Sequence, residues 1–92
     1  MAKQSVRVSI LSQPYTLLAE GDPREVEELA AEVDRLMLSI AARQPNADST
    51  RLAVLACLHL ADRLRALERD LASVRERVER NALLLEQALG ED

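Results

Sequence analysis

The sequence predicts an α+β fold, in which a small N-terminal β-hairpin and a first helix form a head and one long C-terminal helix forms a coiled coil. Three observations predict this class. Residues 5–11 alternate apolar and polar side chains, residues 22–25 carry a helix-start signal, and residues 50–89 contain no glycine or proline. We expect the head to occupy residues 1–48 and the long helix residues 49–92, with its first turns completing the head.

The hairpin is predicted from a period of two. In residues 5–11, SVRVSIL, valine or isoleucine stands at every second position, which is typical of a half-buried strand. Residues 12–14 supply turn residues, and residues 15–19 can return as a second strand with Tyr15 and Leu17 on one face. Because an isolated hairpin is only marginally stable in water, its apolar face must lie against another element.

The first helix has a clear start and stop. Asp22 is a favoured N-cap, Pro23 suits the first helical position, and Glu25 lies where a capping box places an acidic residue. Pro45 ends the helix. The apolar residues that recur at spacings of three and four, and so predict the buried stripe of this helix, are Val26, Leu29, Ala30, Val33, Met37 and Ile40.

The long helix is predicted to follow a short connector, with Asp48 or Ser49 as its cap. At 1.5 Å per residue it would be roughly 60 Å long, so part of it is expected to project from so small a globule. Its apolar residues follow the a and d positions of a heptad repeat, which indicates a coiled coil. These positions, called the seam below, are Cys57, Leu60, Leu64, Leu67, Leu71, Val74, Val78, Asn81, Leu85 and Ala88.

Charges beside the seam favour a parallel pair of helices. In that orientation, position g of one chain meets position e of the next heptad of its partner, so Arg63 faces Glu68. Asp70 likewise faces Arg75. Each exposed pair contributes only about 0.2–1 kcal/mol, so these pairs set orientation more than stability.

Both ends of the long helix are more apolar than a two-stranded seam requires. Residues 52–60 are apolar on nearly every side, so we expect the hairpin and first helix to cover them on several sides. The tail leucines, Leu83, Leu84, Leu85 and Leu89, predict that further helices pack near the C-terminus. The predicted oligomer interface comprises Leu60, Leu64, Leu67, Leu71, Val74, Val78, Asn81, Leu84, Leu85 and Leu89.

Three polar residues of the long helix have simple interpretations. Asn81 is either a tolerated polar residue at a helical crossing or a determinant of register, since a buried amide needs a matching partner. Cys57 is expected to be a small buried core residue. His59 is two residues further along the helix and points in another direction, so a Cys–His dyad is not expected. One histidine per chain is also too few ligands for a metal site.

Composition excludes several classes of function. The net charge is −4, and Tyr15 is the single aromatic residue, so neither the basic surface nor the stacking platform of a nucleic-acid-binding protein is present. One cysteine cannot form an internal disulfide, which fits a reducing cytoplasm. The N-terminus does not resemble a signal peptide, and no apolar run is long enough to cross a membrane. We therefore expect a soluble intracellular protein without membrane contact.

Catalytic and metal-binding patterns are absent from the sequence. No phosphate loop, nucleophile elbow or paired-carboxylate pocket occurs, so we expect no enzyme activity and no cofactor. An acidic cluster on the first helix could suggest a cation site, but its members spread around the helix and predict a solvated face instead. The cluster consists of Glu25, Glu27, Glu28 and Glu32.

Three stretches resemble the ZapA family of bacterial cell-division proteins. "VRVSILSQPYTL" looks like the family's opening hairpin, V-x-V-x-I-L-G-x-x-Y, and "LAAEVDRLMLSI" looks like its first helix. "TRLAVLACLHLADRL" looks like its T-x-R-x-A-V-M-A-A-L-N-I-A-x-E-L stretch. The resemblance spans nearly the whole chain. Ser12 replaces a frequent glycine, Gln13 a frequent basic residue, and His59 the usual asparagine.

The resemblance implies binding to FtsZ, the tubulin-like GTPase of the division ring, and cross-linking of its filaments in the cytoplasm at mid-cell. It also implies dimers that join tail to tail as tetramers. The expected FtsZ-contact residues are Gln13, Tyr15, Arg35 and Arg43. Tyr15 is equally compatible with a place in the core, because it alternates with Leu17.

Two other function classes are compatible with the pattern. The first is a generic coiled-coil adaptor that oligomerises and binds another protein. The second is a chaperone of the prefoldin type, which also combines hairpins with coiled coils. In that type the hairpin lies between two helices, whereas here it precedes both, so the order of elements disfavours it.

Overall fold

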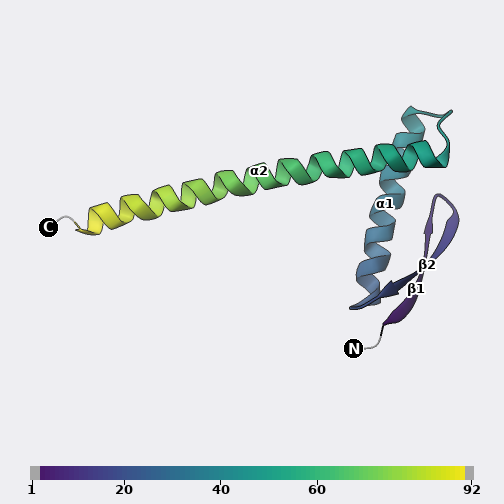
Figure 1. The fold of residues 1–92 in the computed structure, drawn as a ribbon, viewed down its shortest axis with the longest axis horizontal. Coiled ribbons are helices and arrows are strands. Elements are labelled where there is room, and N and C mark those ends of the chain that lie inside the picture. Colours follow the sequence, from purple (N-terminus) through teal and green to yellow (C-terminus); the bar gives the residue numbers. More distant parts are fainter. Residues whose placement is uncertain (1–2, 91–92) are drawn as a thin grey trace. The chain divides into compact units, whose positions relative to one another are not determined.

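The computed structural model describes residues 3–90 and confirms the α+β class (Figure 1). Two strands, β1 (Gln4–Ile10) and β2 (Gln13–Ala19), precede two helices, α1 (Pro23–Arg43) and α2 (Ser49–Gly90). The chain forms two compact units, one ending at Leu58 and the other beginning at His59. The first turns of α2 therefore group with the hairpin and α1, while a boundary between folding domains at residue 48 stays a prediction.

The hairpin is antiparallel, and its register places Val6 opposite Leu17 and Val8 opposite Tyr15. The turn differs from the prediction. Ile10 pairs with Gln13, so the turn consists of Leu11 and Ser12 alone, while the rest of the predicted turn lies in β2. Leu11 and Ser12 have φ angles of 51° and 62°, the left-handed values of a type I′ turn, which matches the twist of the two strands.

Ser12 is in a conformation that favours glycine. A left-handed L-residue costs about 1–2 kcal/mol, whereas glycine adds about 0.5–1 kcal/mol of unfolded-state entropy. We therefore expect Ser12→Gly to raise the free energy of unfolding by about 0.5–1 kcal/mol, measured as a higher denaturant midpoint. Ser9→Gly is the matched control, because Ser9 is an exposed strand residue, and it should lower stability. A lower midpoint for Ser12→Gly would contradict this account of the turn.

Polar side chains begin both helices. Asp22 caps α1: its carboxylate accepts a hydrogen bond from the Arg24 backbone N–H at 3.0 Å, and Pro23 is the first helical residue, as predicted. The bonded N–H is that of Arg24, one residue before the Glu25 position of a capping box. Of the two alternatives for α2, Asp48 is the cap, since its carboxylate accepts from the Arg51 N–H at 2.8 Å.

The head is held together by two apolar clusters. The first joins the sheet to α1 and consists of Val6, Val8, Ala19 and Ala30, with Ile10 and Val26 packed against it. The second joins α1 to the first turns of α2 and is built on Met37, Leu52 and Ala56. Ile10 contacts both clusters, so the end of β1 links the two halves of the head core.

The predicted stripe of α1 is correct except at one position. Leu29 is exposed, whereas Ala30 and Met37 are buried. Leu29 is exposed because α2 packs only on a later part of α1. The second cluster draws only on α1 residues from Val33 onward, so Leu29 precedes the part of α1 that α2 covers. An apolar residue at the edge of a helical stripe is buried only if a neighbouring element extends that far.

Coverage of residues 52–60 is narrower than predicted. Leu52 is 6% exposed and Ala56 is buried, but Val54 and Leu58 are exposed. The expectation that the head covers this stretch on several sides is therefore wrong for the single chain. Cys57, which the sequence predicts to be a buried core residue, is also exposed. The reason is that the second cluster buries only Leu52 and Ala56 of α2, which are four residues apart and so lie on one helical face.

Candidate interaction surfaces

The seam on α2 is a long, uncovered apolar surface in the single chain. All of its leucines and valines are exposed, with Leu64 at 59%. Burying one such side chain contributes about 1.5–3 kcal/mol, so a seam of this length strongly favours association with other helices. The predicted interface residues that lie exposed on α2 are Leu60, Leu64, Leu67, Leu71, Val74, Val78, Asn81, Leu84, Leu85 and Leu89.

The charges that flank the seam are available for pairing between chains. Within residues 3–90, the ion pairs are Lys3 with Glu20 and Arg24 with Asp22, and both lie in the head. Four charged residues beside the seam are exposed on α2 and have no part in these pairs. They are the predicted g and e residues Arg63, Glu68, Asp70 and Arg75.

The tail of α2 carries more apolar surface than one seam. Leu83 and Leu84 lie outside the a and d positions, yet both are exposed leucines like Leu85 and Leu89. On a helix, these four side chains spread over more than one face. The described tail therefore offers more apolar surface than one partner helix would cover.

In the head, the structure separates the four predicted FtsZ-contact residues into two groups. Gln13 and Tyr15 alternate on β2, so their side chains lie on the same face of the hairpin. Tyr15 is 49% exposed, although its cross-strand neighbour Val8 is buried, because the first cluster covers β1 and leaves this part of β2 open. Of the two alternatives for Tyr15, the single chain therefore shows an accessible side chain.

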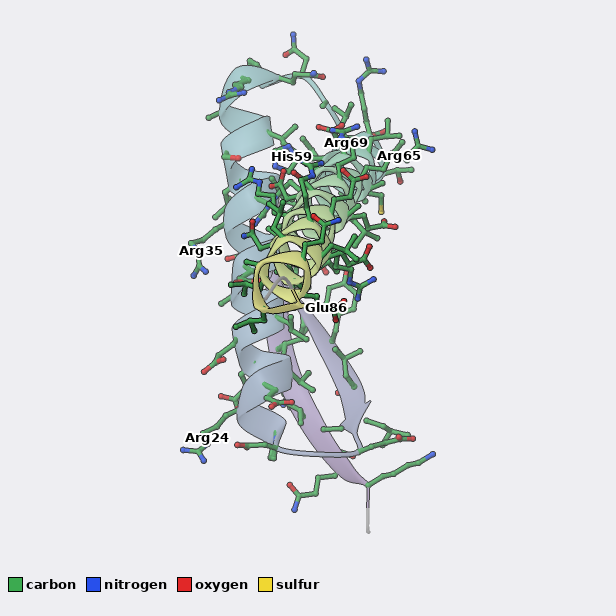
Figure 2. The ribbon with its side chains drawn as sticks, turned by 90° about the vertical axis from the view of Figure 1, so that its left-hand side faces the viewer. Arg24, Arg35, His59, Arg65, Arg69 and Glu86 are labelled. Atoms are coloured by element: carbon green, nitrogen blue, oxygen red, sulfur yellow. The ribbon has the colours of Figure 1, made fainter. Side chains whose placement is uncertain are left out.

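Arg35 lies on a different face of the head. It projects from the side of α1 that points away from the hairpin, as Figure 2 shows. Arg43 is the last residue of α1, eight positions further on, which corresponds to about 12 Å along the axis and about 80° around it. Leu38 lies outside the buried stripe, about 60° around α1 from Arg35, and is 52% exposed. The sequence does carry a signal for this exposure, because Leu38 is out of phase with the apolar residues of the buried stripe.

Charge divides α1 into two halves. The acidic cluster lies in the N-terminal half, and all four of its glutamates are exposed, as a solvated face requires. Residues 35–47 contain Arg35 and Arg43 and no acidic residue. The C-terminal half of the outer face of α1 is therefore locally basic, although the whole chain is acidic.

Other candidate chemistry finds no support in residues 3–90. No group of three or more histidine, cysteine, aspartate or glutamate side chains in this part of the chain could hold a metal ion. Cys57 and His59 are both exposed. Neither α1 nor α2, as described, has the length and apolarity needed to cross a membrane.

Comparison with known proteins decides the family. The family model described as cell division protein ZapA matches residues 6–89, from the hairpin to the end of α2. The chain belongs to the ZapA family. A ZapA cell division protein of Halalkalibacterium halodurans is 41% identical over 66 residues, which cover 72% of each chain. A ZapA protein of Shouchella clausii is 36% identical over 68 residues, covering 74% of this chain and 87% of the relative.

A solved ZapA structure has the same fold. The ZapA mutant dimer from Geobacillus stearothermophilus is 30% identical, with a TM-score of 0.65, and the match covers 86% of this chain and 92% of that one. The resemblance inferred from the hairpin and helix motifs is thus confirmed. ZapA proteins are a structural family of cell division and not a known enzyme family.

Proposed function

We propose that this ZapA-family chain binds FtsZ and cross-links its filaments at the division ring, as a multivalent coiled-coil oligomer in the cytoplasm. The observation that carries the proposal is the exposed seam of α2, which a single chain leaves in water. Membership of a cell-division family supports FtsZ as the partner, in preference to the generic adaptor that the pattern also allows.

The proposed assembly has two steps. Two chains first pair in parallel along the seam. The dimeric state of the structural relative supports pairing, and the Arg63–Glu68 and Asp70–Arg75 charge pattern supports the parallel orientation. Two dimers then join through the tail leucines, giving a tetramer with paired heads at each end. The extra apolar surface at Leu83, Leu84 and Leu89 supports the second step, because a two-stranded seam would leave it exposed.

Multivalency explains how weak head contacts would cross-link filaments. Once one head pair binds a filament, the second pair binds at a high effective concentration, provided the connecting rod spans the two sites. A helix of 42 residues is about 60 Å long when straight, so it would keep the head pairs at the two ends of the rod well apart. Shortening the rod at its tail should therefore remove cross-linking without removing the head contact.

The proposed FtsZ contact uses the accessible residues of the head. Gln13 and Tyr15 form one candidate surface on β2. Arg35 and Arg43, with Leu38 beside Arg35, form the other on α1. FtsZ is acidic in general, as is this chain, so the attraction must come from local arginines. Such contacts between exposed charges weaken as salt is added, because the Debye length falls to about 8 Å at physiological ionic strength.

Truncation after Arg80 tests the bridging mechanism. The shortened chain loses the tail leucines but keeps most of the seam, so it should form dimers that bind FtsZ without bundling it. We expect light scattering of GTP-assembled FtsZ to rise with the intact protein and to stay near the FtsZ-only level with the truncated one. Analytical ultracentrifugation should report a tetramer and a dimer, respectively.

Glu86→Ala is the matched control for the truncation. Glu86 is an exposed residue of the tail outside the seam, so its replacement should leave both the tetramer and the bundling unchanged. Equal bundling by the intact and truncated chains would contradict bridging through the tail. A tetramer that neither bundles FtsZ nor co-sediments with it would favour the generic adaptor.

A further inference from the structure

One hydrogen bond joins the tip of the hairpin to α1. The backbone N–H of Leu11 donates to the Oδ1 atom of Asp34 at 2.8 Å, between residues 23 positions apart, in a partly buried setting. The other side-chain hydrogen bonds within residues 3–90 connect residues at most seven positions apart. Among the side-chain hydrogen bonds of residues 3–90, the Leu11–Asp34 bond therefore spans the greatest sequence separation, and it falls on the hairpin turn.

The turn that receives this bond is strained. Leu11 and Ser12 both have left-handed φ angles, 51° and 62°, where a Cβ atom crowds the backbone. Type I′ turns favour Asn-Gly or Asp-Gly for this reason. A Leu-Ser pair does not favour this conformation by itself, so the surrounding structure must hold it.

Asp34 and the head core hold the turn together. The Leu11 side chain packs against the cluster of Met37, Leu52 and Ala56, while its N–H is bound by Asp34. Asp34 lies one helical turn before Met37, so both contacts come from the same side of α1. Leu11 is thus fixed through its side chain and its backbone at once.

We infer that Asp34 is a positioning residue for partner binding: its carboxylate selects the strained turn and so fixes where β2 begins. Gln13 and Tyr15, the proposed contact residues of the hairpin, are both exposed and begin the strand that follows the turn. If the native turn is populated in only a fraction of molecules, the apparent affinity at these residues falls by that fraction. The inference rests on the proposed function, because the contact it positions is the proposed FtsZ contact of the hairpin.

Asp34→Ala tests this role. The substitution removes the acceptor, and a hydrogen bond to a charged group is strong enough for its loss to lower the equilibrium constant that favours the native turn about tenfold or more. We expect co-sedimentation with FtsZ filaments to need more protein, by up to about tenfold as the native turn becomes the minor conformer, while the oligomer mass stays unchanged. Hydrogen exchange of the Leu11 amide, followed by NMR, should accelerate by a similar factor.

Charge cannot explain such a loss. Removing an aspartate makes the head less acidic, which would strengthen contact with an acidic partner. Glu28→Ala is the matched control, since it removes one negative charge from an exposed position of the same helix. It should bind FtsZ at least as well as wild type and leave the Leu11 amide protected.

Two rescue variants separate positioning from a general loss of structure. Asp34→Asn keeps an oxygen acceptor at the same place and should restore most of the binding. Adding Ser12→Gly to Asp34→Ala relieves part of the strain and should recover part of the binding, without restoring the lost acceptor. If Asp34→Ala alone folds poorly, the double variant with Ser12→Gly can be used to test binding in its place.

The outcomes distinguish this inference from the proposed function. If wild type does not co-sediment with FtsZ, the proposed function is wrong. The role of Asp34 in holding the turn is tested separately: slower or unchanged hydrogen exchange of the Leu11 amide in Asp34→Ala would overturn it. If wild type binds and Asp34→Ala binds equally well, the positioning inference is wrong. Loss of binding in Asp34→Ala with no recovery in either rescue variant would also overturn it.

Discussion

A chain carrying both Leu64→Glu and Leu71→Glu should sediment near the single-chain mass of 10.2 kDa, whereas wild type should sediment as an oligomer. Both leucines are a positions of the seam and are exposed in the single chain. The substitutions remove two buried leucines from each helix and place like charges opposite each other in a parallel pair. Their combined effect on association should exceed about 5 kcal/mol, a factor of more than a thousand in the dissociation constant.

Ala72→Glu with Ser73→Glu is the matched control for this pair. Both residues are exposed on α2 and occupy b and c positions, outside the seam, so the same two charges should leave the oligomer mass unchanged. Sedimentation equilibrium over a range of concentrations separates the two variants. An oligomer that survives both seam substitutions would show that association does not use the a positions.

The sequence predicts which strand residues face the core and where the helices lie, because both follow from the local spacing of apolar residues. The alternation in residues 5–11 correctly predicted that Val6 and Val8 are buried. The turn could not be predicted in the same way. Leu11 and Ser12 lack the residue types of a type I′ turn, and their conformation depends on Asp34, a contact 23 positions away. A tertiary contact thus overrides the local turn signal, which pointed to residues 12–14.

The extent of burial was harder to predict than its presence. Apolar residues on several sides of residues 52–60 indicated cover, but the pattern does not say whether the cover comes from the same chain or another one. In the single chain only Leu52 and Ala56 are buried, while Val54 and Leu58 stay exposed. Their exposure is consistent with cover supplied on assembly, since isolated chains seldom leave neighbouring apolar residues in water without a partner.

Part of the candidate site could be predicted from the sequence. The shared face of Gln13 and Tyr15 follows from strand alternation alone. The separation of Arg35 from the hairpin also follows from helix geometry, because Arg35 is two positions from buried Met37 and so lies about 160° away around α1. The exposure of Tyr15 could not be predicted from the sequence, because it depends on which part of the sheet α1 covers.

Leu52→Asp should unfold the head. Leu52 is 6% exposed and joins α1 to the first turns of α2, so the substitution loses about 1.5–3 kcal/mol of apolar burial and also places an unpaired carboxylate in the core. A total of about 4 kcal/mol or more approaches the whole stability of a small domain. Amides of Val6 and Val8 should then lose their protection against hydrogen exchange. Leu55, in the same apolar stretch, is only half-buried, so Leu55→Asp should lower stability less than Leu52→Asp.

Leu38→Asp is the control that isolates burial from the chemical change. It makes the same substitution at a helical leucine of the head, but Leu38 is on the outer face of α1 and 52% exposed, so it should lower stability by no more than about 0.5–1 kcal/mol. The Val6 and Val8 amides should stay protected in this variant. If Leu52→Asp keeps the wild-type thermal transition and exchange pattern, the cluster of Met37, Leu52 and Ala56 does not hold the head together. Because Leu11 packs on that same cluster, the strained turn should lose its conformation together with the core.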